Sequence, residues 1–371
     1  MFFGIAFTNI CFYLLLAILI IKYKWRIFDN NTGFALLKIF IIYSAGLFII
    51  NFFAFPPANF KLVRHLVKII LIFLMVKSVE EEPSVVKNAL FCFSIAGFLS
   101  ILISLSGLFF SIDLFSDFYS VFENQYYLNG IAGEHHIRYS FKLGIALIFL
   151  ITYIIHNYSY LTIKTKGVIF FAALIIFIGI LFSGSRGVLI SLVVSSAVLL
   201  WFRKIRKSIV CLVIGGIIIF IPSYFLFDGI KNRYNFDNMS SFNGRTVGWK
   251  IIFQNWKVFL KGYGTNRYSE ALKQNNIVEV LPKNAHNIML NYYIEYGITG
   301  IIIYIFFWAG ILYVFLKENQ RKIDVFPGSA FLWIFIFFHL AGWTEDHWEI
   351  ASSQFSLSFA LGLLLKKSPA A

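Results

Sequence analysis

Long apolar stretches follow one another along the whole chain, separated by shorter polar segments. A bilayer crossing needs about 20 mostly apolar residues, so these stretches predict membrane-spanning helices. We expect about eleven spans (10–12), at residues 2–21, 34–55, 60–76, 88–112, 139–156, 167–182, 187–202, 208–227, 297–316, 329–343 and 350–365. The predicted fold class is an all-α polytopic membrane protein, with residues 1–371 forming a single integral membrane domain.

Composition supports this class and excludes others. Of the 371 residues, 59% are hydrophobic and only 13% are charged, and the mean hydropathy is +0.77. Soluble domains carry about 25% charged residues. A soluble enzyme and a disordered chain are therefore excluded. A disulfide scaffold is excluded as well, because Cys11, Cys92 and Cys211 each stand alone in an apolar run.

Basic residues mark every second connection between the predicted spans. Cytoplasmic loops of membrane proteins are enriched in Lys and Arg. Sixteen such residues share one side: Lys22, Lys24, Arg26, Lys77, Lys87, Lys164, Lys166, Arg203, Lys204, Arg206, Lys207, Lys317, Arg321, Lys322, Lys366 and Lys367. We expect this side and the C-terminus in the cytoplasm and the N-terminus outside. The odd number of spans leaves room for a further N-terminal helix.

The largest predicted loop, residues 228–296, lies on the opposite side of the membrane and contains amphipathic sequence. Between Asp228 and His286 it carries nine basic residues against four acidic ones, a net charge of +5. Ordinary solvated lysines and a binding surface for an anion such as a diphosphate both fit this charge. The stretch Arg245–Lys261, with the indoles of Trp249 and Trp256, predicts a helix at the membrane interface.

Cations also occur where the apolar pattern leaves little room for them. Arg186 lies in the small-residue turn Ser183–Gly187 between two apolar runs. It either snorkels to lipid headgroups or contacts an anion beside open backbone amides, and we favour the anion. Arg64 and Lys68 share one face of the span predicted at 60–76, and they either snorkel or face the bundle interior.

His286, Asn287 and Glu295 are the polar residues of an amphipathic segment that leads into the span at 297–316. Histidine is the usual general base near neutral pH, although a loop histidine is more often exposed or a helix cap. Glu295 fits either a supporting partner of the site or a plain interfacial carboxylate. The histidines and carboxylates at 134–136 and 345–349 lack zinc spacing, and no phosphate-binding glycine loop occurs. We therefore expect no metal, no cofactor and no nucleic-acid partner.

Five short motifs follow one another in the second half of the chain. They are Ser-Gly-Ser-Arg186-Gly, Asn232-Arg233-Tyr, Gly244-Arg245-x-x-x-Trp249, Gly262-Tyr-Gly264, and His286-Asn287-x-x-Leu290 with Glu295-x-Gly297-x-x-Gly300. In this order, and with this topology, the chain resembles the O-antigen ligase and O-antigen polymerase superfamily. The likeness covers roughly residues 60–365 and is strongest over 180–300.

The resemblance implies a multi-pass glycosyltransferase of the bacterial inner membrane whose active site faces the periplasm. Such enzymes use undecaprenyl-diphosphate-linked glycans as donors, invert the anomeric carbon and need no metal or nucleotide. The acceptor is lipid A–core or a second lipid-linked glycan, and membrane lipids are the other partners. Ligases usually have twelve spans where eleven are predicted here, which puts the N-terminal topology in doubt.

Residue by residue, the resemblance assigns roles to the motif positions. Arg186 and Arg245 look like the arginines that hold the donor diphosphate, and His286 looks like the residue that activates the acceptor hydroxyl. Arg233 matches a further periplasmic arginine. The resemblance is looser for the remaining substrate-binding candidates, which are Arg64, Lys68, Asn287 and Glu295.

The chemistry follows independently from the residue types. Inverting transfer needs a proton acceptor on one face of the sugar and fixed positive charge on the leaving diphosphate opposite. The resemblance, by the order and distances of its motifs, implies O-antigen ligation to lipid A–core in lipopolysaccharide biosynthesis, with polymerisation of lipid-linked repeat units as the alternative. An anion transporter is a remote alternative, because no internal symmetry of interrupted spans is visible.

Overall fold

The structure is a computed structural model of the 371-residue chain. It describes residues 84–110, 119–122, 125–128, 135–199, 203–226, 248–264, 268–274, 285–318 and 328–344, with the single positions 21, 38–39, 42–43, 45–46, 49, 230–231, 234, 357 and 360. The spans predicted at 2–21, 34–55, 60–76 and 350–365 lie largely outside the described residues.

Each apolar run predicted between residues 88 and 343 coincides with a helix. The helices are α4 (Ser84–Phe110), α5 (His136–Asn157), α6 (Ile163–Phe182), α7 (Arg186–Leu199), α8 (Arg203–Leu226), α12 (Ile288–Glu318) and α13 (Gly328–Gly342). A seven-residue helix, α11 (Tyr268–Gln274), and a short 3-10 helix, η4 (Trp256–Phe259), lie in the predicted loop. The described part of the chain is therefore mostly helical, as expected, and the total of eleven spans stays a prediction.

Four of these helices are long and apolar enough to cross a membrane. Their spanning stretches are Asn88–Ser106, His136–Asn157, Ile163–Phe182 and Ile288–Lys317, and α7, α8 and α13 contribute shorter apolar stretches. Long apolar helices of this kind are typical of polytopic membrane proteins.

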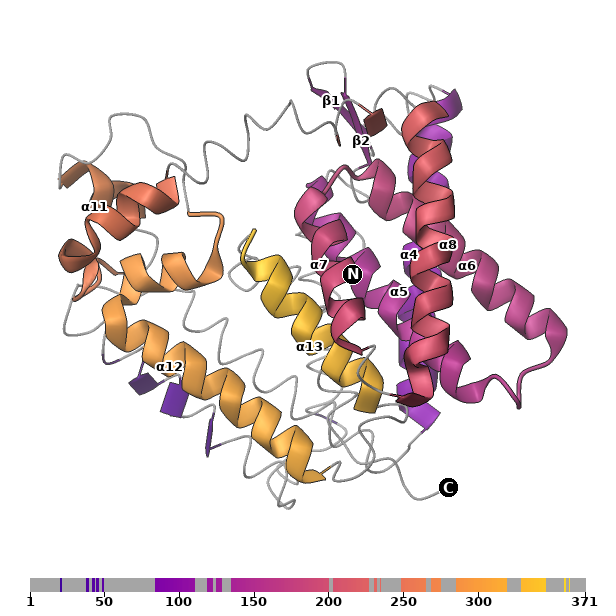
Figure 1. The fold of residues 1–371 in the computed structure, drawn as a ribbon. Coiled ribbons are helices and arrows are strands. Elements are labelled where there is room, and N and C mark those ends of the chain that lie inside the picture. The colour runs from indigo at the N-terminus through magenta and orange to yellow at the C-terminus, as the bar shows by residue number, and fades with distance from the viewer. Residues whose placement is uncertain are drawn as a thin grey trace.

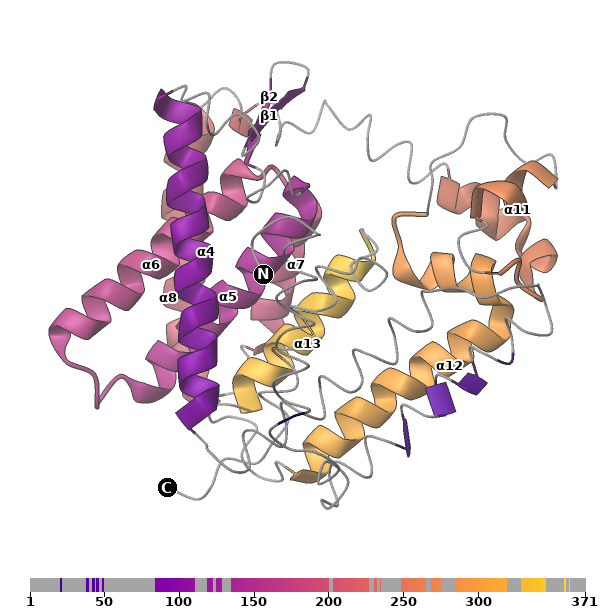
Figure 2. The same ribbon diagram turned by 180° about the vertical axis from the view of Figure 1, so that it is seen from behind.

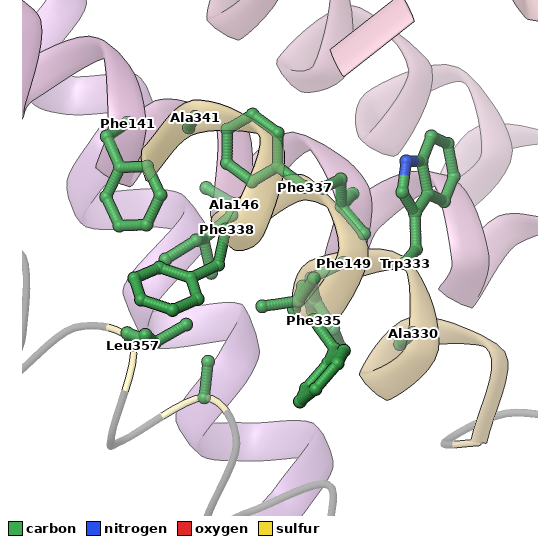
Figure 3. Close-up of a cluster of buried hydrophobic side chains, with 14 of the residues drawn as sticks. Phe141, Ala146, Phe149, Ala330, Trp333, Phe335, Phe337, Phe338, Ala341 and Leu357 are labelled. Atoms are coloured by element: carbon green, nitrogen blue, oxygen red, sulfur yellow. The ribbon is translucent and has the colours of Figure 1, made fainter. Parts of the chain in front are cut away.

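Helix α5 lies at the centre of the bundle, where it packs against α4, α6, α7 and α13. Its contact with α13 is aromatic: the ring of Phe141 stacks on Phe337 with centroids 5.3 Å apart (Figure 3). Gly144 makes this contact possible, because a Cβ there would lie 2.5 Å from the Phe337 ring. The α13 indole of Trp333 in turn donates to Ser195 Oγ of α7 at 3.0 Å. The core of the bundle thus ties α5, α7 and α13 into one unit.

The two views of the ribbon agree on the arrangement of these helices. Helix α13 lies between α12 on one side and the group α4 to α8 on the other, and α11 lies beyond the N-terminal end of α12 (Figures 1 and 2). Since α5, α6 and α7 run alternately up and down, the start of α5 and the α6–α7 turn lie at the same end of the bundle. We call this the site end.

A small hairpin at the site end departs from the all-α prediction. Strands β1 (Tyr119–Phe122) and β2 (Gln125–Leu128) pair antiparallel, with Tyr119 opposite Leu128 and Phe122 opposite Gln125. They fall in the connection between α4 and α5, for which no secondary structure was predicted from the sequence. Tyr and Val favour strands, but a pair of four-residue strands is too short to stand out in a chain dominated by apolar runs.

Candidate active site

The turn between α6 and α7 is compact, and hydrogen bonds satisfy its backbone. Ser183 Oγ donates to the Ile180 carbonyl at 2.6 Å, and the amide of Gly184 donates to Leu181 at 3.0 Å. Gly184 has φ +66°, a left-handed conformation that glycine adopts without strain. The turn therefore has a well-defined conformation, and Arg186 follows it as the first residue of α7.

Arg186 is half-buried at the N-terminus of a 14-residue helix. The free backbone amides of the first helical turn carry partial positive charge. A guanidinium at that position adds a full charge and a planar pair of donors, which suits a phosphate group. The local electrostatics therefore favour an anion at this end of α7.

A second motif lies against the same turn. The hydroxyl of Tyr234 donates to the Leu181 carbonyl at 3.4 Å, and its ring packs edge-on to Phe220 of α8 with centroids 5.4 Å apart. Tyr234 is the last residue of the Asn-Arg-Tyr motif, and it is the residue of this motif that the structure places beside the Arg186 turn. Arg233 itself lies outside the described residues, as do Arg245, Arg64 and Lys68.

His286 occupies a backbone position that is held from both sides. The amide of Ala285 donates to Asn291 Oδ1 at 2.7 Å, and the Ala285 carbonyl accepts from the indole Nε1 of Trp249 at 2.8 Å. Asn287 then caps α12, with its Oδ1 accepting from the Leu290 amide at 3.1 Å. His286, between these anchors, has φ +49°, and it is the only non-glycine residue with positive φ in the part of the chain that the structure describes.

A non-glycine residue in the left-handed region costs about 1–3 kcal/mol and persists only where its surroundings fix it. Such positions cluster at functional sites, which makes His286 a candidate for a functional role, and its role as a base stays a prediction. The anchoring indole was not foreseen in this form. The sequence analysis placed Trp249 at the membrane interface, whereas its Nε1 bonds inward to Ala285.

One turn brings the two motifs together. We call Gly342, Trp343 and Thr344, at the end of α13, the bridging turn. Its Trp343 carbonyl accepts from Asn287 Nδ2 at 3.3 Å, and a Cβ on Gly342 would lie 2.5 Å from the side chain of Ile288.

The other side of the bridging turn meets the Arg186 segment. A Cβ on Gly187 would overlap the Thr344 hydroxyl, so α7 and the turn are in direct contact there. Arg186 and His286, far apart in sequence, thus flank one short piece of chain. In the sequence, Gly342 and Trp343 end the span predicted at 329–343, and only the histidine and carboxylates at 345–349 were candidates for a metal. The bridging contacts had no visible signal in the pattern.

The structure shows the surroundings of Asn287 and Glu295, the two polar residues whose roles the sequence left open. Both polar atoms of the Asn287 amide already have backbone partners, so in this structure the side chain positions its neighbour His286. Glu295 is buried in α12, eight residues further on, which is about 12 Å along a helix axis. A direct contact of either residue with substrate stays a prediction.

Two glycine segments form the joint at which Glu295 lies. Gly297, with φ +69°, interrupts α12, and a Cβ on Gly262 would lie 2.6 Å from the Gly297 amide nitrogen. The amides of Tyr263 and Gly264 donate to the carbonyls of Ile294 and Glu295 at 2.9 and 2.7 Å. The Gly-Tyr-Gly motif, which alone suggested only a tight turn, therefore docks the segment before it onto α12.

The structure also reveals a buried cation that the sequence analysis did not single out. Lys142, two turns into α5, is 0% exposed. Ionisable residues inside membrane helices are rare and usually face the bundle interior, where they serve function or pairing. The available signal was a lysine within the apolar run 139–156.

The histidines at the start of α5 have structural contacts. His135 Nδ1 accepts from the Ile137 amide at 3.4 Å, and its ring stacks on His136 with centroids 4.2 Å apart. Among the described residues, no three His, Cys, Asp or Glu side chains gather as metal ligands would.

The fold and this polar end define the class: a polytopic helical membrane protein with a candidate anion site where α7, α12 and α13 meet. A family model described as O-antigen ligase matches residues 171–305, a segment that runs from α6 through Arg186 and His286 into α12. The match covers about a third of the chain and supports the O-antigen ligase superfamily, in agreement with the resemblance seen in the motifs. None of the curated proteins matches the chain.

This match supports an O-antigen ligase or polymerase type of function. It supports a membrane enzyme of the glycosyltransferase kind that acts on lipid-linked glycans in general. The matched segment contains every motif position assigned above except Arg64 and Lys68, and it ends before the bridging turn.

Proposed function

We propose that the protein transfers a glycan from undecaprenyl diphosphate to an acceptor hydroxyl at the periplasmic face of the bacterial inner membrane. The reaction proposed is O-antigen ligation to lipid A–core, within lipopolysaccharide biosynthesis. The observation that carries the proposal is the bridging turn, which contacts Gly187 beside Arg186 on one side and Asn287 beside His286 on the other. These contacts support placing the proposed general base and the proposed anion-binding arginine, from distant motifs, in one site.

In the proposed step, the acceptor oxygen attacks the anomeric carbon as its proton passes to His286. The bond between that carbon and the diphosphate oxygen breaks, and undecaprenyl diphosphate leaves from the opposite face, which inverts the configuration. Arg186 and Arg245 stabilise the negative charge that develops on the leaving group. Fixed guanidinium groups can do so without a metal, because they carry charge at every physiological pH.

Substrate contacts complete the proposal. Arg233 belongs to the motif that Tyr234 anchors beside the α6–α7 turn, so it is the next candidate for the diphosphate. Arg64 and Lys68 are proposed to line the donor path from a membrane span. Asn287 and Glu295 are proposed to support the acceptor side, Asn287 by fixing the backbone of His286.

The test is a transfer assay with purified protein in liposomes. The assay supplies an undecaprenyl-diphosphate-linked repeat unit, with and without lipid A–core, and the products are resolved on a gel. A ladder shift that needs lipid A–core supports ligation, and lengthening of the lipid-linked glycan without it supports the polymerase alternative. No product in either lane, from a folded sample, would contradict both and favour the anion transporter.

Substitutions of site residues test whether the transfer activity depends on the proposed site. Arg186→Ala and His286→Ala should each abolish transfer without changing expression or folding. Lys164→Ala is the matched control, because Lys164 is exposed at the other end of α6, about 30 Å from the Arg186 turn. Near-normal transfer by either site variant would remove its assigned role.

A further inference from the structure

The segment 248–264 has two apolar faces, and only one of them is covered by protein. Ile252 and Phe259 are buried with Leu272 of α11 and Ile294 of α12. Phe253, by contrast, is 64% exposed, and Trp256 is 48% exposed. An exposed pair of large aromatic side chains on one short helical segment is unusual on a surface that faces water.

The exposed aromatics are held at the depth where α12 begins its long apolar stretch. The Trp256 carbonyl accepts from the Tyr293 hydroxyl, and the Leu260 carbonyl accepts from the Ile298 amide at 3.1 Å. Ile298 follows the break at Gly297 and starts the apolar run that continues to residue 316. The segment is therefore fixed beside the point at which this helix enters its apolar stretch.

The apolar run of α12 that starts beside this segment also has an exposed side. Ile298, Ile302 and Ile305 are all about half exposed, and their spacing of four and three residues places them on one side of the helix. We expect this side to face lipid tails, because α12 is long and apolar enough to cross a membrane. The 248–264 segment is bonded to its first residue, Ile298.

Charge gives this face a preference among membrane lipids. Lys250, Lys257 and Lys261 are exposed on the segment, and no acidic residue occurs between positions 248 and 264. The ammonium of Lys257 lies 5.9 Å from the centroid of the Trp256 ring. Aromatic rings at headgroup depth with lysines beside them are the combination that binds an anionic lipid surface.

We propose that Phe253, Trp256 and Val258 insert into the headgroup region of the leaflet at which α12 enters the membrane, and that Lys250, Lys257 and Lys261 contact anionic phospholipid headgroups there. This docking surface differs from the interfacial helix expected from sequence, because Trp249 is turned inward. The inference does not depend on the transfer reaction.

Docking would also set the height of the candidate general base above the membrane. Trp249, on the covered face of the segment, bonds to Ala285, the residue before His286. A lipid-linked donor presents its diphosphate at headgroup depth, so a segment fixed at that depth would bring His286 to the reacting group. This consequence alone rests on the proposed function.

The experiment uses spin labels on the full-length protein in lipid nanodiscs. In a background with Cys11, Cys92 and Cys211 replaced by Ser, Phe253→Cys and Trp256→Cys are labelled separately with a nitroxide. Collision with oxygen reports lipid, and collision with a soluble nickel chelate reports water. Lys273→Cys, at an exposed position on α11, is the matched control.

We expect both labels to collide preferentially with oxygen and the control label with the nickel chelate. Preference for the nickel chelate at both 253 and 256 would overturn the docking. Two positions are used so that a local disturbance at one of them does not decide the result.

The charge is tested by replacing Lys250, Lys257 and Lys261 with Gln in the labelled Phe253→Cys protein. Each lysine near an anionic surface changes the ratio of docked to undocked protein about fivefold, so three change it on the order of a hundredfold. We expect this loss in nanodiscs that contain phosphatidylglycerol and little change in neutral ones. Lys273→Gln, the control, should leave the ratio unaltered. An equal ratio for the triple variant and its parent in phosphatidylglycerol would overturn the anionic-lipid assignment.

Discussion

The interior of the bundle and the 248–297 region are stabilised in different ways. Around α5 and α13, many aromatic and aliphatic side chains share the packing, as in the stack of Phe141 on Phe337. In the described part of 248–297 the apolar core is small, and single contacts hold the backbone around His286 and at the glycine joint: an indole bond to Ala285, an amide cap and two glycines in backbone contact. The bundle should therefore tolerate substitution, whereas the region that carries His286 should not.

The largest effect is expected at the glycine joint. In Gly297→Ala, the new Cβ would overlap the Leu260 carbonyl at a residue with φ +69°. The left-handed conformation alone costs a non-glycine residue about 1–2 kcal/mol, and the overlap adds to it. We expect transfer to be abolished and the thermal midpoint in detergent to fall clearly.

Gly248→Ala is the control for this change. Gly248 belongs to the same region, and nothing lies within 4 Å of a Cβ placed there. Activity and stability should stay unchanged or rise slightly, because alanine favours the helix by about 0.5–1 kcal/mol. If both glycine variants behaved alike, the joint would have no special role.

The next effect is expected where Asn287 connects two helices. Asn287→Asp keeps an oxygen that accepts from the Leu290 amide but loses the donor to the Trp343 carbonyl. The variant therefore tests the bond to the bridging turn while the helix cap remains. We expect the helix content to stay and transfer to fall roughly a hundredfold, since small misplacements of a reacting group have effects of that size. The measurement is the initial transfer rate beside far-ultraviolet circular dichroism.

Asn255→Asp is the matched control, because Asn255 Nδ2 also donates to a carbonyl, that of Ile251 at 2.9 Å, yet makes no tie to α13. Its transfer rate should stay near that of the parent. An equal loss in both variants would show that the bridging turn is not what matters.

A smaller effect is expected at Trp249. Trp249→Phe keeps the ring in the small core and removes only the bond to Ala285, which is worth about 1 kcal/mol. We expect kcat to fall about tenfold through a looser His286, with the KM for the donor unchanged. Tyr160→Phe, at an exposed position beyond the other end of α5, should leave kcat alone, and a matching loss there would argue against a specific role for the Ala285 bond.

The smallest effect is expected in the bundle core. Phe337→Leu replaces one large apolar side chain by another and should cost only about 1 kcal/mol of stability, because apolar cores accept such exchanges. Transfer should remain near normal in the liposome assay. A loss as large as that of Asn287→Asp would mean that the bundle is no more tolerant than the region around His286.

The same contrast explains what the sequence could and could not predict. Helices α4 to α8, α12 and α13 follow from long apolar runs, a property that needs no knowledge of partners. The inward turn of Trp249 and the contacts of the bridging turn depend on long-range hydrogen bonds that no local pattern encodes. The hairpin was missed because its strands are only four residues long.

The candidate site contains features that the sequence could predict and features that it could not. His286 and Arg186 stood out as polar residues beside apolar runs, and the motifs connected them to a family. That they flank one turn of α13 could not be seen in the sequence, because residues 342–344 carry no motif of their own. Lys142 was visible as a lysine in an apolar run, but only the structure shows that it is fully buried.

The central claim is that Arg186 and His286 act in one site on one reaction. The most direct measurement is a double-mutant cycle on the transfer rate, with Arg186→Lys, His286→Gln and the two combined. Residues that act as a unit give strongly non-additive losses, so the double variant should lose little more than His286→Gln alone, a loss of about 10²–10⁴-fold. A double-variant loss equal to the product of the single losses, or a near-normal rate for either single variant, would contradict the account.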